Sequence, residues 1–192
     1  MAHSPEFREF YSRWKEKARA YQSDLQGSFD RFFTLYVLFN RLYTEATFRL
    51  GQRGDVKITN RNRFPDAEAA QEYVVQYLGA TTLITGLSGD SERSALDSIR
   101  NQVCSGTFWV KLDMLTGSPQ ADRDRDLCQR LSDSNSNTQA VAVLETLYAI
   151  RCNMFHGRKG FHSVQQQLLE PLNIILERII DILYEKLKRD GS

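Results

Sequence analysis

The segment from Phe29 to Leu50 constrains the fold more than any other, because a helix built from it is apolar on nearly every face. At the helical repeat, aromatic side chains form one stripe and mainly leucines form a second. The first stripe is Phe29, Phe33, Tyr36, Asn40 and Tyr43, and the second is Leu35, Leu38, Phe39 and Leu42. A helix that is apolar all round is buried in the centre of a domain. We therefore predict a central helix over residues 29–50, which begins after a break at Gly27-Ser28 and ends at Gly51.

Two further strongly apolar helices are predicted, over residues 138–156 and 163–189. In the first, residues at alternating spacings of three and four form two core faces, of which one contains Tyr148 and Arg151. In the second, Pro171 predicts a kink or a fresh start near Glu170. The apolar band of this last helix is wider than a normal seam, which indicates either a broad core contact or a surface for a second copy of the chain.

The rest of the chain completes an all-α pattern. Weaker helical signals cover about 5–21, 65–79, 91–103 and 122–131, whereas residues 80–89 read as a loop or a single turn. Irregular loops are expected around 51–64 and 104–137. A chain of 192 residues most simply forms one domain. We therefore predict a single-domain helical bundle over residues 1–192.

Charge, cysteines and hydropathy narrow the possible functions. The formal net charge is only +1, so a nucleic-acid partner would have to use a local basic patch. The three cysteines are widely spaced and odd in number, which favours a reducing cytoplasm over a disulfide framework. Neither a zinc-binding motif nor an apolar run of 18 residues is present, so we expect no metal site and no membrane span.

Two polar features of the first third require explanation. Asn40 falls within the aromatic stripe that contains Tyr43, where it either braces a neighbouring helix as a satisfied core residue or contributes to a site. The loop over 51–64 carries Arg61 and Arg63 among asparagines. Those arginines are either solvated surface residues or contacts to phosphates.

Arg151 and His156 are the residues that most plausibly carry chemistry. An arginine on an apolar stripe is costly unless it pairs with an anion. In an ideal helix, five residues separate the two side chains by about 140°, so they converge only where the helix stops. Gly157 supplies that stop and places His156 near the C-cap, where the helix dipole favours the imidazolium. A histidine beside a permanent cation suits proton transfer at a phosphate.

The residues around this pair resemble those of the HEPN (higher eukaryotes and prokaryotes nucleotide-binding) domains. Arg151 to His156 matches the R-x4-H signature of that family. Its wider context, Arg-Cys-Asn-Met-Phe-His-Gly-Arg-Lys, is similar to the R-N-N-L-F-H-G-x-K form of Apea-like members. The helix around Phe39-Asn40-Arg41-Leu42-Tyr43 is similar to their "FNALY" helix. These elements cover about half the chain, and residues 52–135 match nothing in the family pattern.

The resemblance implies metal-independent cleavage of RNA without any cofactor. The ribose 2′-OH would attack the adjacent phosphate, His156 would act as general acid or base, and Arg151 would stabilise the phosphorane charge. Members of the family often have a polar residue directly after the arginine, but in this chain that position is Cys152. Asn153 would then be the third catalytic residue, or the site would lack such a polar residue. Further positions implied by the motif or by local charge are Arg158, Lys159, Arg61 and Arg63 for RNA binding, and Asn40, Tyr43 and Gly157 for structural support.

The resemblance also implies a homodimer in which two R-x4-H motifs face one cleft. It favours a toxin or antiviral-defence effector in the cytoplasm, with an antitoxin or another regulatory protein as a possible partner. The alternative is a catalytically inactive HEPN-like module that binds RNA or protein, and a third reading is an unrelated helical adaptor. If the two residues have only structural roles, Arg151 forms an ion pair with Glu145 or Asp181, and His156 is a plain C-cap residue.

Overall fold

A computed structural model of the protein describes residues 4–56, 64–113, 115–155 and 163–190. Over these ranges the chain is helical, and the only β-type pairing is an isolated bridge between Leu112 and Pro119. The predicted all-α, single-domain bundle is therefore confirmed. The elements in chain order are α1 (Pro5–Arg19), α2 (Leu25–Arg53), α3 (Asp66–Glu68), the π-helical turn η1 (Ala69–Tyr73), α4 (Val74–Leu78), α5 (Ala80–Gly86), α6 (Asp90–Cys104), α7 (Ala121–Leu131), α8 (Ser136–Phe155) and α9 (Ser163–Asp190).

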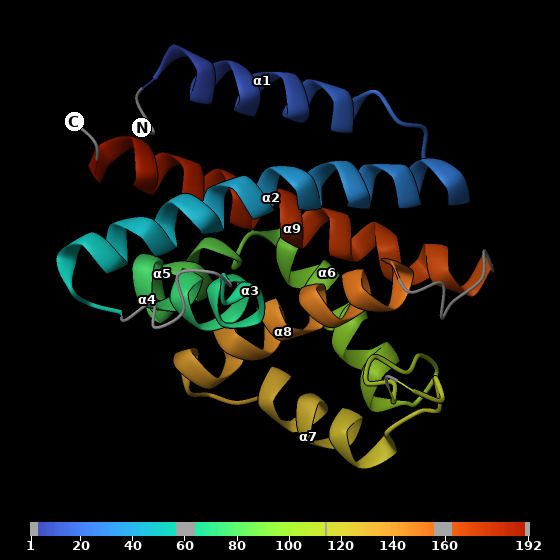
Figure 1. Ribbon diagram of the computed structural model, residues 1–192. Coiled ribbons are helices and arrows are strands. Elements are labelled where there is room, and N and C mark those ends of the chain that lie inside the picture. The colour runs from blue at the N-terminus through green and yellow to red at the C-terminus, as the bar shows by residue number, and fades with distance from the viewer. Residues whose placement is uncertain (1–3, 57–63, 114, 156–162, 191–192) are drawn as a thin grey trace.

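The long helices α2 and α9 form the centre of the molecule. In Figure 1, α1 lies on one side of this pair, and α8 and then α7 lie on the other. The side chains between them are fully buried, including Phe32, Phe39, Leu147 and Leu176. Burial of one such side chain contributes about 1.5–3 kcal/mol. The prediction that the segments around 29–50 and 138–156 are core helices is thus confirmed.

Both predicted ends of α2 were wrong by a few residues. The helix begins at Leu25, because the Asp24 side chain caps it by accepting a hydrogen bond of 2.6 Å from the Gly27 amide. Gly27 lies inside the first turn, where a Cβ atom would stand 2.1 Å from the Gln22 carbonyl oxygen. The glycine therefore permits a close approach of the chain rather than a helix break. At the other end, Gly54 and not Gly51 adopts the left-handed conformation that stops the helix.

α9 continues through Pro171, so the helix does not start afresh near Glu170, and the alternative of a kink there stays a prediction. A proline inside a helix lacks the amide that would bond the carbonyl four residues earlier, here that of Gln167. The Gln102 side chain of α6 donates a hydrogen bond of 3.0 Å to the Gln167 carbonyl and so replaces the missing donor. The broad apolar band of α9 packs inside the chain's own core, and Ile174 is its one large exposed member among the described residues.

The segment over residues 80–89, expected to be a loop or a turn, contains the helix α5. The sequence pattern that would predict this helix is weak, because the helix has just seven residues and Leu83 is the only buried one. Leu83 and the following Leu87 are almost completely buried. Tertiary packing on those two leucines stabilises a helix too short to be stable by itself.

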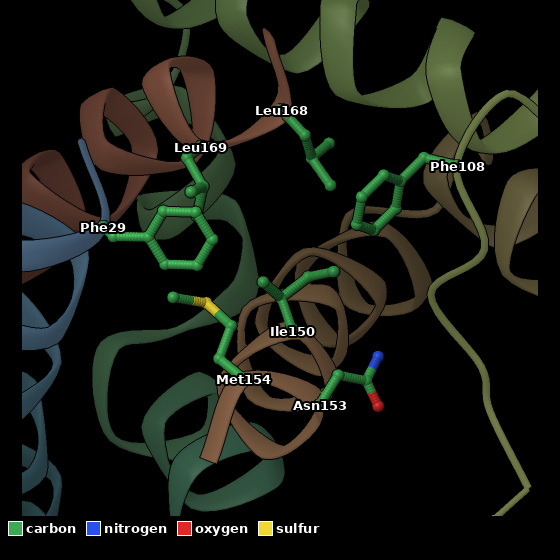
Figure 2. Close-up of a pocket in the computed structure, with 7 residues that line it drawn as sticks. All are labelled: Phe29, Phe108, Ile150, Asn153, Met154, Leu168 and Leu169. Atoms are coloured by element: carbon green, nitrogen blue, oxygen red, sulfur yellow. The ribbon is translucent and has the colours of Figure 1, made fainter. Parts of the chain in front are cut away.

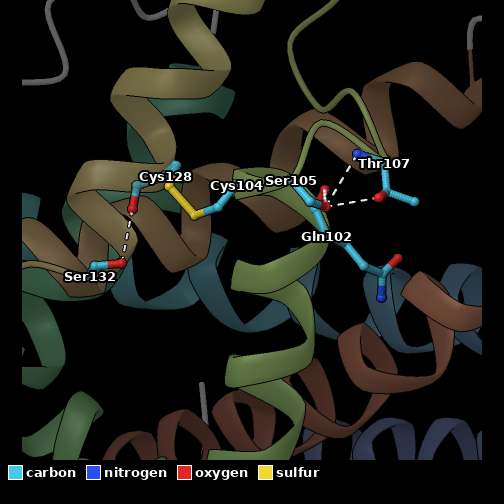
Figure 3. Close-up of a disulfide and its surroundings, with 6 residues drawn as sticks. All are labelled: Gln102, Cys104, Ser105, Thr107, Cys128 and Ser132. Atoms are coloured by element: carbon cyan, nitrogen blue, oxygen red, sulfur yellow. Dashed lines mark hydrogen bonds between the residues drawn. A yellow bond between two sulfur atoms is a disulfide. The ribbon is translucent and has the colours of Figure 1, made fainter.

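The cysteine pattern was misread, because Cys104 and Cys128 form a disulfide that joins the end of α6 to α7 (Figure 3). Their Cα atoms are 5.2 Å apart, and Cys152 is the free cysteine. The expectation of no disulfide rested on spacing along the chain, whereas the packing of α6 against α7 decides which cysteines meet. In the described ranges, no helix combines the length and apolar character that a membrane span requires.

Reduction of the disulfide is expected to lower the free energy of unfolding by about 3 kcal/mol, since the bridge closes a loop between cysteines 24 residues apart. Guanidinium denaturation with and without a thiol reductant measures the difference. The C104S/C128S double variant is the control and should be insensitive to the reductant. Equal stability of the reduced and oxidised wild type would contradict a stabilising bridge.

Candidate active site

Arg151 lies on the last turns of α8, where its neighbours come from α8 itself and from two other helical segments, α2 and α3. Its guanidinium stacks over the rings of Tyr36 from α2 and Tyr148 from α8, at 5.4 and 5.9 Å from the ring centroids. Its Nη1 atom is 3.7 Å from Oδ2 of Asp66, the first residue of α3. The Arg151 side chain is 24% exposed, so the cation lies at the edge of the core and is reached in part by solvent.

Two tyrosines orient the Asp66 carboxylate. The Tyr43 hydroxyl donates to Oδ1 at 2.5 Å, and the Tyr148 hydroxyl donates to Oδ2 at 3.3 Å. Burial, reinforced by Asp66, raises the pKa of the Tyr43 phenol. Burial, followed by the neighbouring Cys152 and Asp66, raises the pKa of Tyr148 to about 12. Both phenols are therefore protonated at neutral pH, as donation to a carboxylate requires.

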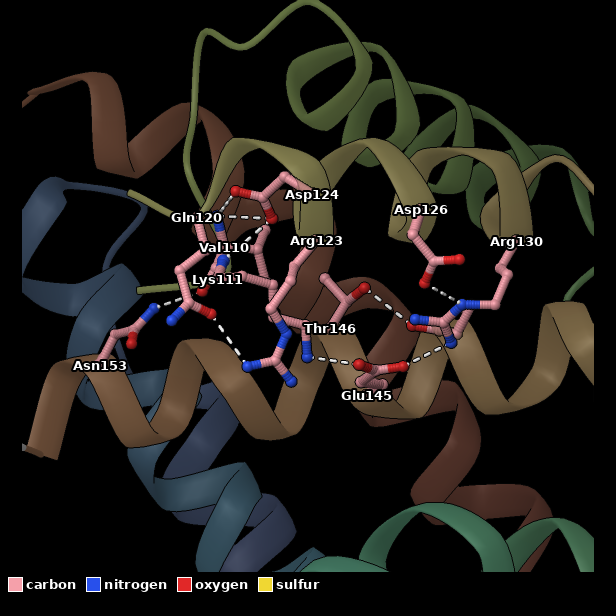
Figure 4. A network of polar contacts seen from close by, with 11 residues as sticks. Val110, Lys111, Gln120, Arg123, Asp124, Asp126, Arg130, Glu145, Thr146 and Asn153 are labelled. Carbon is pink, nitrogen blue, oxygen red and sulfur yellow. Dashed lines mark hydrogen bonds and ion pairs between the residues drawn. The ribbon is translucent and has the colours of Figure 1, made fainter. Parts of the chain in front are cut away.

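The expected ion-pair partners of Arg151 were wrong. Glu145 pairs instead with Lys111 and Arg130 (Figure 4), and Asp181 pairs with Lys15. Glu145 is six residues before Arg151, which places the two side chains about 120° apart around α8. Asp66 was missed because it is 85 positions away in the sequence, in a segment with no signal for a site.

Asn153 does not face the Arg151 cluster. It is buried, and its amide donates a hydrogen bond of 2.8 Å to the Val110 carbonyl in the loop before α7. The residue also borders a small apolar pocket lined by Phe29, Phe108, Ile150, Met154, Leu168 and Leu169 (Figure 2). Because residues two apart on a helix point about 200° apart, Asn153 and Arg151 serve different neighbours.

The two α2 residues predicted as structural support behave differently. Tyr43 is completely buried and reaches the site through Asp66. Asn40 is only half-buried and accepts a weak hydrogen bond of 3.4 Å from the Thr44 hydroxyl on its own helix. Of the two alternatives for Asn40, the satisfied core residue is wrong, because Asn40 is only half-buried and lies next to the exposed Val37; a contribution to a site stays a prediction.

Several predicted site residues lie outside the described residues. They are His156, Gly157, Arg158, Lys159, Arg61 and Arg63. The helix that carries Arg151 is described as far as Phe155, so the predicted end at residue 156 lies outside the described residues. Cys152 is half-buried, and its sulfur accepts a weak contact of 3.9 Å from Arg151.

Sequence reasoning missed Asp66 and the roles of Tyr36 and Tyr148, although both tyrosines were on predicted core stripes. The available signal was the presence of aromatic hydroxyls on the two most buried helices, since buried phenols usually require a hydrogen-bond partner. Asp66, Tyr36 and Tyr148 together hold the permanent, partly exposed cation of Arg151, which suits the binding of an anion such as a phosphate.

Comparisons with other proteins add no assignment. In the described part of the chain, no group of three or more His, Cys, Asp or Glu side chains is placed to hold a metal ion. No family model, curated protein or solved structure matches the chain.

Proposed function

We propose that the protein is a HEPN-type endoribonuclease that cleaves RNA by attack of the ribose 2′-OH on the adjacent phosphate. The observation that supports this most strongly is the setting of Arg151. A guanidinium held by Asp66 and two tyrosine rings lies on α8, five positions before His156 in the sequence. RNA is the substrate class because the reaction requires the 2′-OH as nucleophile.

In the proposed reaction, each residue of the motif has one role. His156 transfers the proton between the 2′-OH and the leaving 5′-oxygen, as a general base or a general acid. Arg151 stabilises the charge that develops on the phosphorane oxygens. The products would be a 2′,3′-cyclic phosphate and a 5′-hydroxyl. Asn153 is not part of this proposal, because its amide is engaged by the Val110 carbonyl.

The biological setting is also proposed and not observed. We infer a homodimer with a composite cleft, acting in the cytoplasm as a toxin or antiviral-defence effector under control of a regulatory protein. Thiols in the cytoplasm are kept reduced, so the activity must not depend on the Cys104–Cys128 bridge. We therefore expect cleavage to persist in the presence of a thiol reductant.

A second candidate function is a catalytically inactive HEPN-like module that binds RNA or a partner protein. The ion pair between Arg151 and Asp66 favours this alternative, because a carboxylate beside the guanidinium offsets part of its attraction for a phosphate. The cleavage assay distinguishes the two candidates.

The test is cleavage of single-stranded RNA by purified protein in EDTA. We expect cyclic-phosphate products from the wild type, and a loss of about 100-fold or more for His156→Ala and for Arg151→Ala. Arg125→Ala is a matched control, because that arginine is 70% exposed and pairs only with its own helix neighbour Asp122 among the described residues. A substrate with 2′-deoxyribose at every position should remain intact.

Two results would count against the nuclease. Equal cleavage by the wild type and by His156→Ala would identify a contaminating ribonuclease, and RNA binding without cleavage would favour the inactive module. Thermal denaturation of Arg151→Ala separates the structural reading from the catalytic one. A large loss of stability would show that the arginine mainly supports the fold.

A further inference from the structure

An arginine that stabilises a transition state must be held in place before the reaction, because disorder of the cation weakens its effect. The two residues that follow Arg151 do not hold it through a strong polar contact. Cys152 offers only a sulfur at 3.9 Å, and the Asn153 amide is bonded to the Val110 carbonyl. The guanidinium instead contacts the Asp66 carboxylate and two tyrosine rings.

We propose that Asp66 is the positioning residue of the Arg151 guanidinium, with Tyr43 and Tyr148 orienting its carboxylate. This inference rests on the proposed nuclease function and adds a residue that the R-x4-H motif does not contain. Asp66 Oδ2 faces Arg151 Nη1 at 3.7 Å, while its two oxygens accept one phenol each, from Tyr43 at 2.5 Å and from Tyr148 at 3.3 Å.

The fold brings Asp66 to this position through close packing of the segment that follows it. After Asp66, the chain enters η1, whose Ala69 and Ala70 are completely buried. η1 packs against both α2 and α8, the helices that carry Tyr43 and Arg151. Small side chains at Ala69 and Ala70 allow that close approach, and the carboxylate consequently lies between the two helices.

The geometry suits positioning better than neutralisation. A tight, bidentate arginine–carboxylate pair has N···O distances of about 2.7–2.9 Å, and the separation of 3.7 Å here is longer. The Asp66 side chain is 37% exposed, so water screens its charge. The phenols limit the motion of the carboxylate, which in turn limits the motion of the guanidinium stacked on Tyr36 and Tyr148.

The two possible effects of the Asp66 charge predict opposite results for Asp66→Asn. If Asp66 positions Arg151, kcat should fall by about 100-fold while KM changes little, because a displacement of about 1 Å can cost that factor. If Asp66 only masks the positive charge, its removal should strengthen RNA binding and leave kcat unchanged or higher. Steady-state cleavage of a single-site RNA oligonucleotide gives kcat and KM separately.

Conservative variants and a control complete the experiment. Asp66→Glu keeps the charge and should recover most of the lost kcat. Tyr148→Phe removes one phenol and should lower kcat by a smaller factor, which also tests the idea if Asp66→Asn fails to fold. Asp97→Asn is the matched control, because Asp97 is a surface carboxylate paired with an arginine of its own helix.

The Arg151 Nε–Hε resonance provides a readout that does not require catalysis. It should be well resolved in the wild type and in Asp97→Asn, and broadened or shifted in Asp66→Asn. Wild-type kcat in Asp66→Asn, or an unchanged Arg151 resonance, would overturn the assignment of Asp66 alone. A wild-type protein that cleaves no RNA would instead reject the proposed function, and a role for Asp66 in that reaction with it.

Discussion

Replacement of Lys15 by methionine is expected to lower the free energy of unfolding by about 3–5 kcal/mol, the usual cost of removing one partner from a buried ionic cluster. Lys15 on α1 is only 5% exposed, and its ammonium lies 2.7 Å from carboxylate oxygens of both Glu177 and Asp181 on α9. Methionine fills a similar volume but removes the cation that the two carboxylates share.

The two carboxylates also have other partners, which together with Lys15 form a larger polar cluster. Glu177 also pairs with Arg31 at 2.6 Å, and Asp181 accepts a hydrogen bond of 2.6 Å from the Tyr11 hydroxyl. Burial by itself would raise the pKa of the Glu177 carboxyl, but hydrogen bonds from Lys15 and Arg31 outweigh it and lower that pKa. A lowered pKa in the folded state stabilises the protein above the unfolded pKa, and this contribution is lost as the pH falls.

Urea denaturation at pH 7 and in the acid range measures both effects. We expect the wild type to lose stability as the pH falls below the ordinary glutamate value of 4.5, and Lys15→Met to show less of this dependence. Arg13→Met is the control, since the Arg13–Glu9 pair is 76% and 58% exposed and should contribute less than about 0.5 kcal/mol. Equal stability of Lys15→Met and the wild type would show that the cluster does not anchor α1.

Replacement of Asp124 by alanine is expected to cost about 3 kcal/mol, because it removes the acceptor of two backbone amides. Asp124 on α7 is 1% exposed, and its carboxylate accepts hydrogen bonds from the Val110 amide at 3.1 Å and the Lys111 amide at 2.9 Å (Figure 4). The Val110 carbonyl accepts from Asn153, so the same loop residue connects α7 to the end of α8.

Thermal or urea denaturation measures this cost, and two variants make the interpretation specific. Asp124→Asn keeps one acceptor oxygen and should lose about half as much stability as Asp124→Ala. Asp122→Ala is the control, because its side chain is 92% exposed on the same helix. If Asp124→Ala and Asp122→Ala were equally stable, the carboxylate would not hold the loop before α7.

The main elements of the fold could be predicted because helical periodicity is a local property of the chain. The apolar faces of α2, α8 and α9 are visible at spacings of three and four residues, and all three helices are buried where expected. α5 could not be predicted because Leu83 is its one buried residue. Pro171 was read as an interruption because the donor that compensates it, Gln102, belongs to another helix.

The candidate site was predictable only in part, because its contacts join residues that are far apart in the sequence. Arg151 was singled out because a cation on an apolar stripe needs an anion, and the structure provides one in Asp66. Which acid it would be could not be inferred, since Glu145 and Asp181 are equally plausible from composition and already serve other cations. Asn153 was assigned by its place in a motif, whereas its contacts show a residue that holds the Val110 loop.

The sequence alone determined that this chain forms an all-helical bundle around three apolar helices, and that a costly arginine lies near the end of one of them. Helical periodicity and the energetic cost of an unpaired charge on an apolar stripe can both be inferred from residues that lie close together in the sequence. The tertiary structure decided the partners: Asp66 for Arg151, Val110 for Asn153, and Cys128 for Cys104. These contacts join residues from 24 to 85 positions apart, and only the packing of helices against one another brings such residues together.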